Sequence, residues 1–407
     1  MELIFTILFI LSSVWLAKLI FERLSMPPIL GELLVGMIIG PPVLGLLGGL
    51  GSDALFVWSN SMDLLADLGM FFMMFYAGLS TDPKELSKKV KSFVGIGILG
   101  TFTPLFLGFL VTWAFTHNFW VSLLVGLAIS GTSLATKSRI LDDLGILRTK
   151  LGHSMMGGGM VDNIISFIIL TLALNAIAEE SISLISILIT ISLVAGFFGG
   201  VLFVGYYIYP IVGPSFAKSR ERGFVFAFIM GLLIAGVGQL AGLHFVIGAY
   251  LAGLFVREEI MPRKYQFNNF SGGLGNLDSR FRTLSHGFLG PIFIVSVAYK
   301  VDFGAVGGAP LFLLGLIGAA IVGKLVGAGL GAYISEANSW KESLTVGIAM
   351  NGRGTVELIL AALALEKLEA FNETHLSLLV LTAFVTTLMV PVVLRYIVPE
   401  LSDLERV

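Results

Sequence analysis

Long apolar segments alternate with short polar connections along almost the whole chain of 407 residues. A helix of roughly 20 apolar residues can cross a bilayer, and this pattern predicts thirteen of them. They are expected near residues 3–22, 28–48, 62–80, 92–115, 119–137, 152–177, 182–212, 222–241, 243–257, 284–301, 309–334, 343–365 and 375–398. The pattern therefore predicts an all-α polytopic membrane protein.

Positive charges gather in alternate connections of this arrangement. The connection after the fifth predicted helix, for example, holds Lys137, Arg139, Arg148 and Lys150, whereas the even-numbered connections carry few lysines and arginines. Because cytoplasmic loops are enriched in Lys and Arg, the N-terminus is expected outside and the C-terminus inside. Thirteen helices satisfy this charge pattern.

Two predicted helices are interrupted by short polar stretches. Residues 130–133 read Ser-Gly-Thr-Ser within the fifth helix, and residues 351–355 read Asn-Gly-Arg-Gly-Thr within the twelfth. The two helices are seven apart, as an inverted repeat would place them, and paired broken helices indicate a binding site at the midplane of the membrane. The alternative is that glycine is simply common in membrane helices.

One carboxylate stands near the middle of the sixth predicted helix. Asp162 and its neighbour Asn163 lie in an otherwise apolar or small-residue stretch. An ionised carboxylate at this depth costs several kcal/mol, so Asp162 is expected to be paired, protonated or in a water-filled cavity. A transport site fits these conditions, and a purely structural ion pair is the alternative.

A few other charges fall within predicted helices. Lys324 is in the middle of the eleventh helix and needs an anionic partner, such as the carboxylate of the sixth helix, or helix C-terminal carbonyls. Arg353 and Glu357 are four residues apart and can neutralise each other or support ion binding directly. Lys18 is near enough to a helix end to extend to the interface, and Glu32 suits a helix N-terminus.

The composition agrees with membrane embedding and excludes several classes of function. Hydrophobic residues make up 56% of the chain and charged residues 13%, the mean hydropathy is +0.94, and the net charge is −2. A nucleic-acid partner is not expected at this charge. The chain has no cysteine, no phosphate-binding glycine loop and no metal-ligand spacing among its histidines. Neither an enzyme activity nor a resident cofactor is expected.

Several motifs, in this order, resemble the monovalent cation:proton antiporter-2 family, which includes Kef-type potassium and NapA-type sodium exchangers. They are Pro27-Pro28-Ile29-Leu30-Gly31-Glu32, Gly40-Pro41-Pro42-Val43-Leu44-Gly45, Leu65-Ala66-Asp67-Leu68-Gly69, Phe75-Tyr76-Ala77-Gly78-Leu79, Thr132-Ser133, Asp143-Leu144-Gly145, Val295-Ser296-Val297, Val301-Asp302, Lys324 and Asn351-Gly352-Arg353-Gly354 with Glu357. They run through nearly the whole chain.

The resemblance implies an NhaA-like antiporter fold, with inverted repeats, two crossing broken helices, and a core bundle that moves relative to a panel. The panel is expected to form a homodimer. The implied boundaries are 1–398 for one transmembrane antiporter domain, about 1–50 and 182–257 for the panel, about 62–177 and 284–398 for the core, and 399–407 for a short cytoplasmic tail.

The resemblance also implies the site residues. The expected cation- and proton-binding residues are Asp162, Asn163, Thr132 and Ser133, of which Asp162, Thr132 and Ser133 would ligate the alkali cation. The expected electrostatic support comes from Lys324, Arg353, Glu357 and Asn351. Family members usually carry the carboxylate second in the pair on the sixth helix, and here it is first.

These features together predict a secondary antiporter of the cytoplasmic membrane. It would exchange Na⁺ or K⁺ for H⁺ by alternating access, with cation and proton competing at Asp162. With one carboxylate beside the non-titrating Asn163, exchange is expected to be one for one and without net charge. One alternative is a sodium-coupled symporter of an organic anion, anchored by Arg353. The other is a non-transporting member whose reversed residue pair marks a degenerate site.

Overall fold

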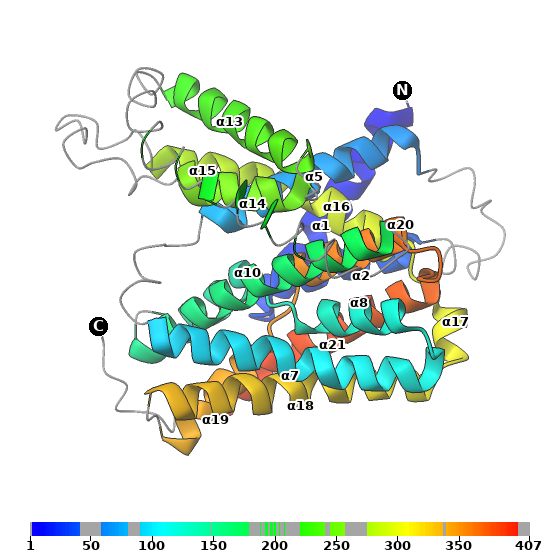
Figure 1. The fold of residues 1–407 in the computed structure, drawn as a ribbon. Helices are drawn as coiled ribbons and strands as arrows, with labels where there is room; N and C mark the ends of the chain where they lie inside the picture. The colour runs from blue at the N-terminus through cyan, green and yellow to red at the C-terminus, as the bar shows by residue number, and fades with distance from the viewer. Residues whose placement is uncertain are drawn as a thin grey trace. The chain divides into compact units, whose positions relative to one another are not determined.

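The computed structural model describes residues 2–40, 58–79, 90–147, 149–178, 220–240, 245–256, 275–336 and 339–397, with a few single residues between 188 and 207. The regular elements in these ranges are helices (Figure 1). The predicted all-α class is thus confirmed for the part of the chain that is described. The predicted tail, residues 399–407, lies outside it.

The helices follow the apolar segments of the sequence. In chain order they are α1 (Glu2–Arg23), α2 (Pro28–Ile39), α5 (Asn60–Leu79), α7 (Val90–Thr116), α8 (Phe119–Ser130), α9 (Leu134–Asp143), α10 (Lys150–Ala178), α13 (Arg220–Leu240), α14 (Phe245–Val256), α15 (Gly275–Arg282), the π-helix η4 (Thr283–Phe288), α16 (Leu289–Tyr299), α17 (Phe303–Gly307), α18 (Pro310–Glu336), α19 (Trp340–Ala349), α20 (Thr355–Lys367) and α21 (Glu373–Ile397).

Eight helical segments among the described residues are long and apolar enough to cross a membrane, and the segments of α2, α8 and α14 are shorter apolar helices. The count of thirteen spans is not confirmed. The seventh predicted span, 182–212, lies mostly outside the described residues, and the fifth and twelfth predicted spans are each split into two short helices.

Side-chain caps fix where several of these helices begin. Asn118 accepts a hydrogen bond from Val121 N at the start of α8 (3.1 Å). Ser339 and Glu342 form a capping box at the start of α19, in which two otherwise unpaired N–H groups are satisfied. Asp302 accepts from the backbone at the start of α17. These polar residues end the apolar segments and set the lengths of the helices.

The chain divides into two compact units. One comprises residues 1–63, 84–173 and 294–407, and the other comprises residues 64–83 and 174–293. All eight predicted site residues belong to the first unit. The panel and core boundaries inferred from the resemblance concern which helices move, and they stay a prediction.

The second unit packs helices at close range around aromatic side chains. Gly78 of α5 faces the carbonyl of Tyr250 on α14 so closely that a β-carbon would collide with it, and Gly253 faces Phe75 in the same way. The rings of Phe75 and Phe281 have centroids 4.5 Å apart. Such small-residue contacts are typical of helix packing in membranes.

In the first unit, α7 and α18 lie alongside each other, as Figure 1 shows in cyan and gold. Gly323, Gly327 and Gly331 recur every fourth residue on the contacting face of α18. A β-carbon at Gly331 would lie 2.5 Å from Gly95 O, and one at Gly327 would collide with Leu99 O. The glycines therefore let the two backbones approach closely.

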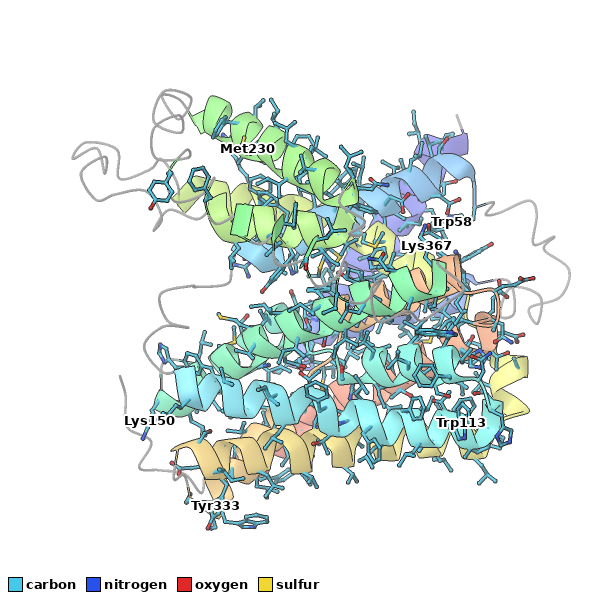
Figure 2. The ribbon with its side chains drawn as sticks, viewed as in Figure 1. Trp58, Trp113, Lys150, Met230, Tyr333 and Lys367 are labelled. Carbon is cyan, nitrogen blue, oxygen red and sulfur yellow. The ribbon has the colours of Figure 1, made fainter. Side chains whose placement is uncertain are left out.

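Two labelled side chains, Tyr333 of α18 and Trp113 of α7, give the direction of this helix pair. Lys150, at the start of α10, and Tyr333, near the end of α18, lie at one end of the unit in Figure 2. Trp113, near the end of α7, lies at the opposite end. Because α7 begins where α18 ends, the two helices run antiparallel.

Both predicted helix breaks are confirmed, and they touch each other. Residues 131–133 separate α8 from α9, and residues 350–354 separate α19 from α20. Ser133 N donates a hydrogen bond to Gly352 O at 3.0 Å. Gly354 has φ +158°, and a β-carbon there would lie 2.7 Å from Ile29 Cδ1, so the second break needs glycine at this position.

One expectation about the first two helices is corrected. Lys18 was expected to be near enough to a helix end to extend to the interface, and Glu32 to suit a helix N-terminus. Instead Lys18 Nζ lies 2.6 Å from Glu32 Oε1, joining α1 to α2. The pairing follows from burial, because Glu32 is 5% exposed and a buried carboxylate requires a compensating charge.

Candidate functional site

The carboxylate of Asp162 is fully buried and receives three polar side chains from three other parts of the first unit. Asp162 Oδ1 accepts a hydrogen bond from Thr101 Oγ1 on α7 at 2.6 Å. Asp162 Oδ2 accepts from Lys324 Nζ on α18 at 2.7 Å and from Thr132 Oγ1 in the first break. The expected contact of Lys324 with this carboxylate is confirmed, and the two opposite charges compensate each other.

Close helix packing explains why these groups meet. A β-carbon at Gly97 of α7 would lie 2.5 Å from Val161 Cγ1 of α10. Thr101 is one turn beyond Gly97, and Val161 is next to Asp162 in sequence. On its other side α7 packs against the glycine face of α18, so that Lys324 reaches the same carboxylate.

The hydroxyl of Thr101 suits either protonation state of the carboxylate. Its oxygen lies 2.6 Å from Asp162 Oδ1 and 2.7 Å from Gly97 O. A hydroxyl has one proton to donate, and with ionised Asp162 it donates to the carboxylate. When Asp162 carries a proton on Oδ1, it can donate to Thr101 while Thr101 donates to Gly97 O. The Thr101 hydroxyl thus keeps a hydrogen-bond partner in either case.

The other two predicted binding residues lie differently. Ser133 Oγ hydrogen-bonds to Thr136 Oγ1 at 2.9 Å and accepts from Thr136 N, at the start of α9. Asn163 is 1% exposed, and neither of its amide atoms has a hydrogen-bond partner among the described residues. An unsatisfied buried amide is costly, and within the described part of the chain the side chain of Asn163 lacks the partners that a buried amide ordinarily has.

The predicted pairing of Arg353 and Glu357 is confirmed, at the start of the second broken helix's C-terminal half. Arg353 Nη1 lies 3.7 Å from Glu357 Oε1 and donates to Ile129 O near the end of α8. Carbonyls at a helix C-terminus lack an intrahelical donor, so the guanidinium satisfies one of them, while Glu357 stands in the first turn of α20. Asn351 Nδ2 donates to Gly347 O at 3.0 Å, within the second broken helix.

Two buried polar residues near the site were not predicted. Thr101 was missed, although a hydroxyl within an apolar helix, one turn before Pro104, is a signal that the sequence carries. Lys137 was placed in a connection, and this is wrong because the lysine is 1% exposed. The chain re-enters helical structure immediately after the first break, so α9 holds Lys137 inside the unit rather than at its surface.

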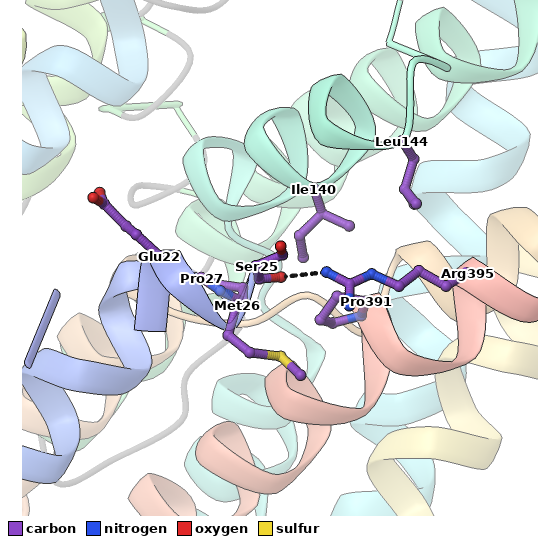
Figure 3. Close-up of a pocket in the computed structure, with 8 residues that line it drawn as sticks. All are labelled: Glu22, Ser25, Met26, Pro27, Ile140, Leu144, Pro391 and Arg395. Carbon is purple, nitrogen blue, oxygen red and sulfur yellow. Dashed lines mark hydrogen bonds between the residues drawn. The ribbon is translucent and has the colours of Figure 1, made fainter. Parts of the chain in front are cut away.

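A cavity of about 380 Å³ lies apart from this carboxylate, near the ends of α1, α9 and α21. Arg395 Nη2 donates to Ser25 O at 2.8 Å across its wall (Figure 3). The lining residues are Glu22, Ser25, Met26, Pro27, Ile140, Leu144, Pro391 and Arg395. The cavity thus borders the end of the helix that follows the first break.

Comparisons with known proteins identify the family of the chain. The family model of the transmembrane sodium/hydrogen exchangers matches residues 7–399. The chain is 27% identical over 400 residues to the Na⁺/H⁺-K⁺ antiporter GerN of Bacillus cereus, covering 97% of this chain and 96% of that protein. It is 27% identical over 401 residues to a Na⁺/H⁺ antiporter of Enterococcus hirae, covering 97% and 98%.

A solved structure shares the fold. The sodium proton antiporter MjNhaP1 of Methanocaldococcus jannaschii matches with a TM-score of 0.68 and 19% identity, over 98% of this chain and 97% of that chain. The family resemblance read from the motifs is thereby confirmed, and the relatives are antiporters rather than enzymes. The chain belongs to the sodium/hydrogen exchanger family of multi-pass membrane antiporters.

Proposed function

We propose that this protein is a secondary antiporter that exchanges Na⁺ or K⁺ for H⁺ across the cytoplasmic membrane by alternating access. Cation and proton compete at Asp162. The observation that carries the proposal is the environment of this carboxylate, which is fully buried yet receives Thr101, Thr132 and Lys324. A buried carboxylate with such neighbours can hold a proton or an alkali cation in turn.

The residues around Asp162 have the chemistry that a hard cation requires. Alkali cations, like other hard cations, prefer oxygen ligands. Asp162 supplies carboxylate oxygens, Thr132 supplies a hydroxyl oxygen, and Asn163 brings an amide oxygen that has no other described hydrogen bond. Lys324 compensates the carboxylate while no cation is bound. The transported ions are substrates, and the proposal needs no resident cofactor.

The contact between the two breaks supports the alternating-access part of the proposal. A broken helix can change the angle between its halves without unwinding an intact hydrogen-bond ladder. Thr132 lies within the first break and contacts Asp162, so a movement of the break changes the surroundings of the carboxylate. Arg353 and Glu357 keep the helix ends compensated at the second break.

The membrane placement and assembly belong to the same proposal. The distribution of Lys and Arg supports an N-terminus outside and a C-terminus inside. A homodimer formed through the panel helices is proposed from the family resemblance. Of the two alternatives, a symporter of organic anions is not favoured, because the relatives found by the comparisons are cation/proton antiporters.

Replacement of Asp162 tests the proposal. Everted vesicles would be energised with a proton gradient, and dequenching of a pH-sensitive dye would be followed on adding Na⁺, K⁺ or Li⁺. Asp162→Asn should abolish cation-dependent proton movement in folded protein, since the amide cannot titrate. Asp302→Asn is the control, because the side chain of Asp302 caps the start of α17 and loss of its charge should leave exchange intact.

Two outcomes would contradict the proposal. Near wild-type exchange by folded Asp162→Asn would remove Asp162 from the cycle. A wild-type protein that folds but moves no protons with any of these cations would favour the non-transporting alternative.

A further inference from the structure

Lys137 is a buried charged residue that the proposed exchange at Asp162 does not use. Its side chain is 1% exposed. Lys137 Nζ donates a hydrogen bond to Met155 O at 3.0 Å and lies 2.9 Å from Met350 Sδ. An ammonium has three protons to donate, and these two contacts offer it one carbonyl and one weak thioether acceptor.

The ammonium lies on the face of α10 that carries Asp162. A methyl group at position 159 would collide with Lys137 Nζ, so the nitrogen rests directly on Gly159. Met155, Gly159 and Asp162 are spaced i, i+4 and i+7, and such residues line one face of a helix. Three residues of helix rise about 4.5 Å. The ammonium is therefore about one turn from Asp162, on the side toward Lys150.

No carboxylate compensates this charge at contact distance in the described part of the chain. None of the ion pairs found there includes Lys137. The charged groups that act on it from neighbouring helices are Asp162 on α10 and Lys324 on α18, and these two already pair with each other at 2.7 Å. At the end of α19, the contact is the uncharged Met350, the first residue of the second break.

An uncompensated buried ammonium costs several kcal/mol. The neutral amine avoids this cost, and it can still hydrogen-bond to Met155 O. Because burial disfavours the charged form of an amine, the side chain of Lys137 can release its proton.

We propose that Lys137 is a second proton-carrying group of the exchange cycle. The inference rests on the proposed exchange at Asp162 and extends it. In each cycle Lys137 passes from –NH₃⁺ to –NH₂ and releases its proton to the same side of the membrane as the proton from Asp162. Two protons then move against one monovalent cation, so each cycle moves one net charge, in contrast to the one-for-one exchange expected from the sequence.

Currents from proteoliposomes on a solid-supported membrane test the inference. A Na⁺ concentration jump drives exchange without any ionophore, and a pH-sensitive dye measures proton movement in the same preparation. The wild-type protein should give proton movement together with a current. Lys137→Met, a flexible apolar replacement, should retain proton movement and lose at least nine-tenths of the current per proton.

Lys137→Arg separates proton transfer from simple charge. A guanidinium keeps the positive charge and the donors but cannot be deprotonated in proteins. The proposal therefore expects Lys137→Arg to lose the current as Lys137→Met does. A structural role for the charge would instead let arginine restore it. Gly159→Ala keeps Lys137 in the sequence, but the added methyl group displaces Lys137 Nζ. This variant should also lower the current per proton.

The results distinguish failure of this inference from failure of the proposed function. Exchange without current in the wild-type protein, or an unchanged current per proton in Lys137→Met or Lys137→Arg, would overturn the role of Lys137 and leave exchange at Asp162 standing. If neither variant of Lys137 folds, the current per proton of Gly159→Ala decides, and an unchanged value would overturn the role. A wild-type protein without any cation-dependent proton movement would contradict both.

Discussion

At the scale of single residues, the site depends on how many donors each oxygen of Asp162 receives. Oδ2 accepts from Lys324 and Thr132, whereas Oδ1 accepts from Thr101. Hydrogen bonds to a charged group contribute about 1.5–3 kcal/mol each. A hydrogen bond between neutral groups contributes less. Loss of the donor to Oδ1 should therefore destabilise the ionised form of Asp162 more than the protonated form.

Thr101→Val removes this hydroxyl and keeps the shape of the side chain. We expect the Na⁺ concentration for half-maximal exchange to rise about tenfold, the equivalent of roughly 1.4 kcal/mol, because the ionised form of Asp162 loses a donor. Dye dequenching at a series of Na⁺ concentrations measures it. Thr171→Val is the matched control, since the buried hydroxyl of Thr171 donates to Phe167 O on α10. An unchanged half-maximal concentration would remove Thr101 from the site.

At the scale of helices, the glycine face of α18 sets the distance between Lys324 and α7. Gly327→Ala places a methyl group against Leu99 O, and the two helices must separate. We expect a lower thermal unfolding temperature and slower exchange. Gly318→Ala is the control on the same helix, because nothing lies within 4 Å of its added methyl group. It should be neutral or stabilise by up to about 1 kcal/mol. Equal unfolding temperatures for both variants would contradict the close packing.

The sequence predicted the helices and their breaks better than it predicted which polar side chains are buried. Polar runs within apolar segments identified both breaks. The pairing of Lys324 with Asp162 was predicted because a buried charge needs a partner. Lys137 was misplaced because hydropathy along the chain places a charge near a segment end outside the membrane. A broken helix can continue inward past that point. The contact of Thr101 with Asp162 depends on how α7 packs, which periodicity does not record.

At the scale of the whole molecule, the absence of cysteine in the sequence makes assembly directly testable. A homodimer through the panel predicts that cysteines at Ile229 or Leu233 of α13 cross-link between protomers. Cysteines at Val322 or Val326 of α18 should not. All four side chains are 42–56% exposed, so accessibility is matched. Efficient cross-linking through α18 and not α13 would contradict a panel dimer.

The hydrogen bond between Ser133 N and Gly352 O has a consequence for biosynthesis. It joins segments that leave the ribosome far apart in time. Until α19 has been inserted, the first break lacks the acceptor that satisfies Ser133 N, and unpaired backbone groups in a bilayer cost several kcal/mol each. The backbone hydrogen bonding of the N-terminal half is therefore incomplete until the C-terminal half has been inserted. The first break therefore reaches its final hydrogen bonding only after the second broken helix has been inserted.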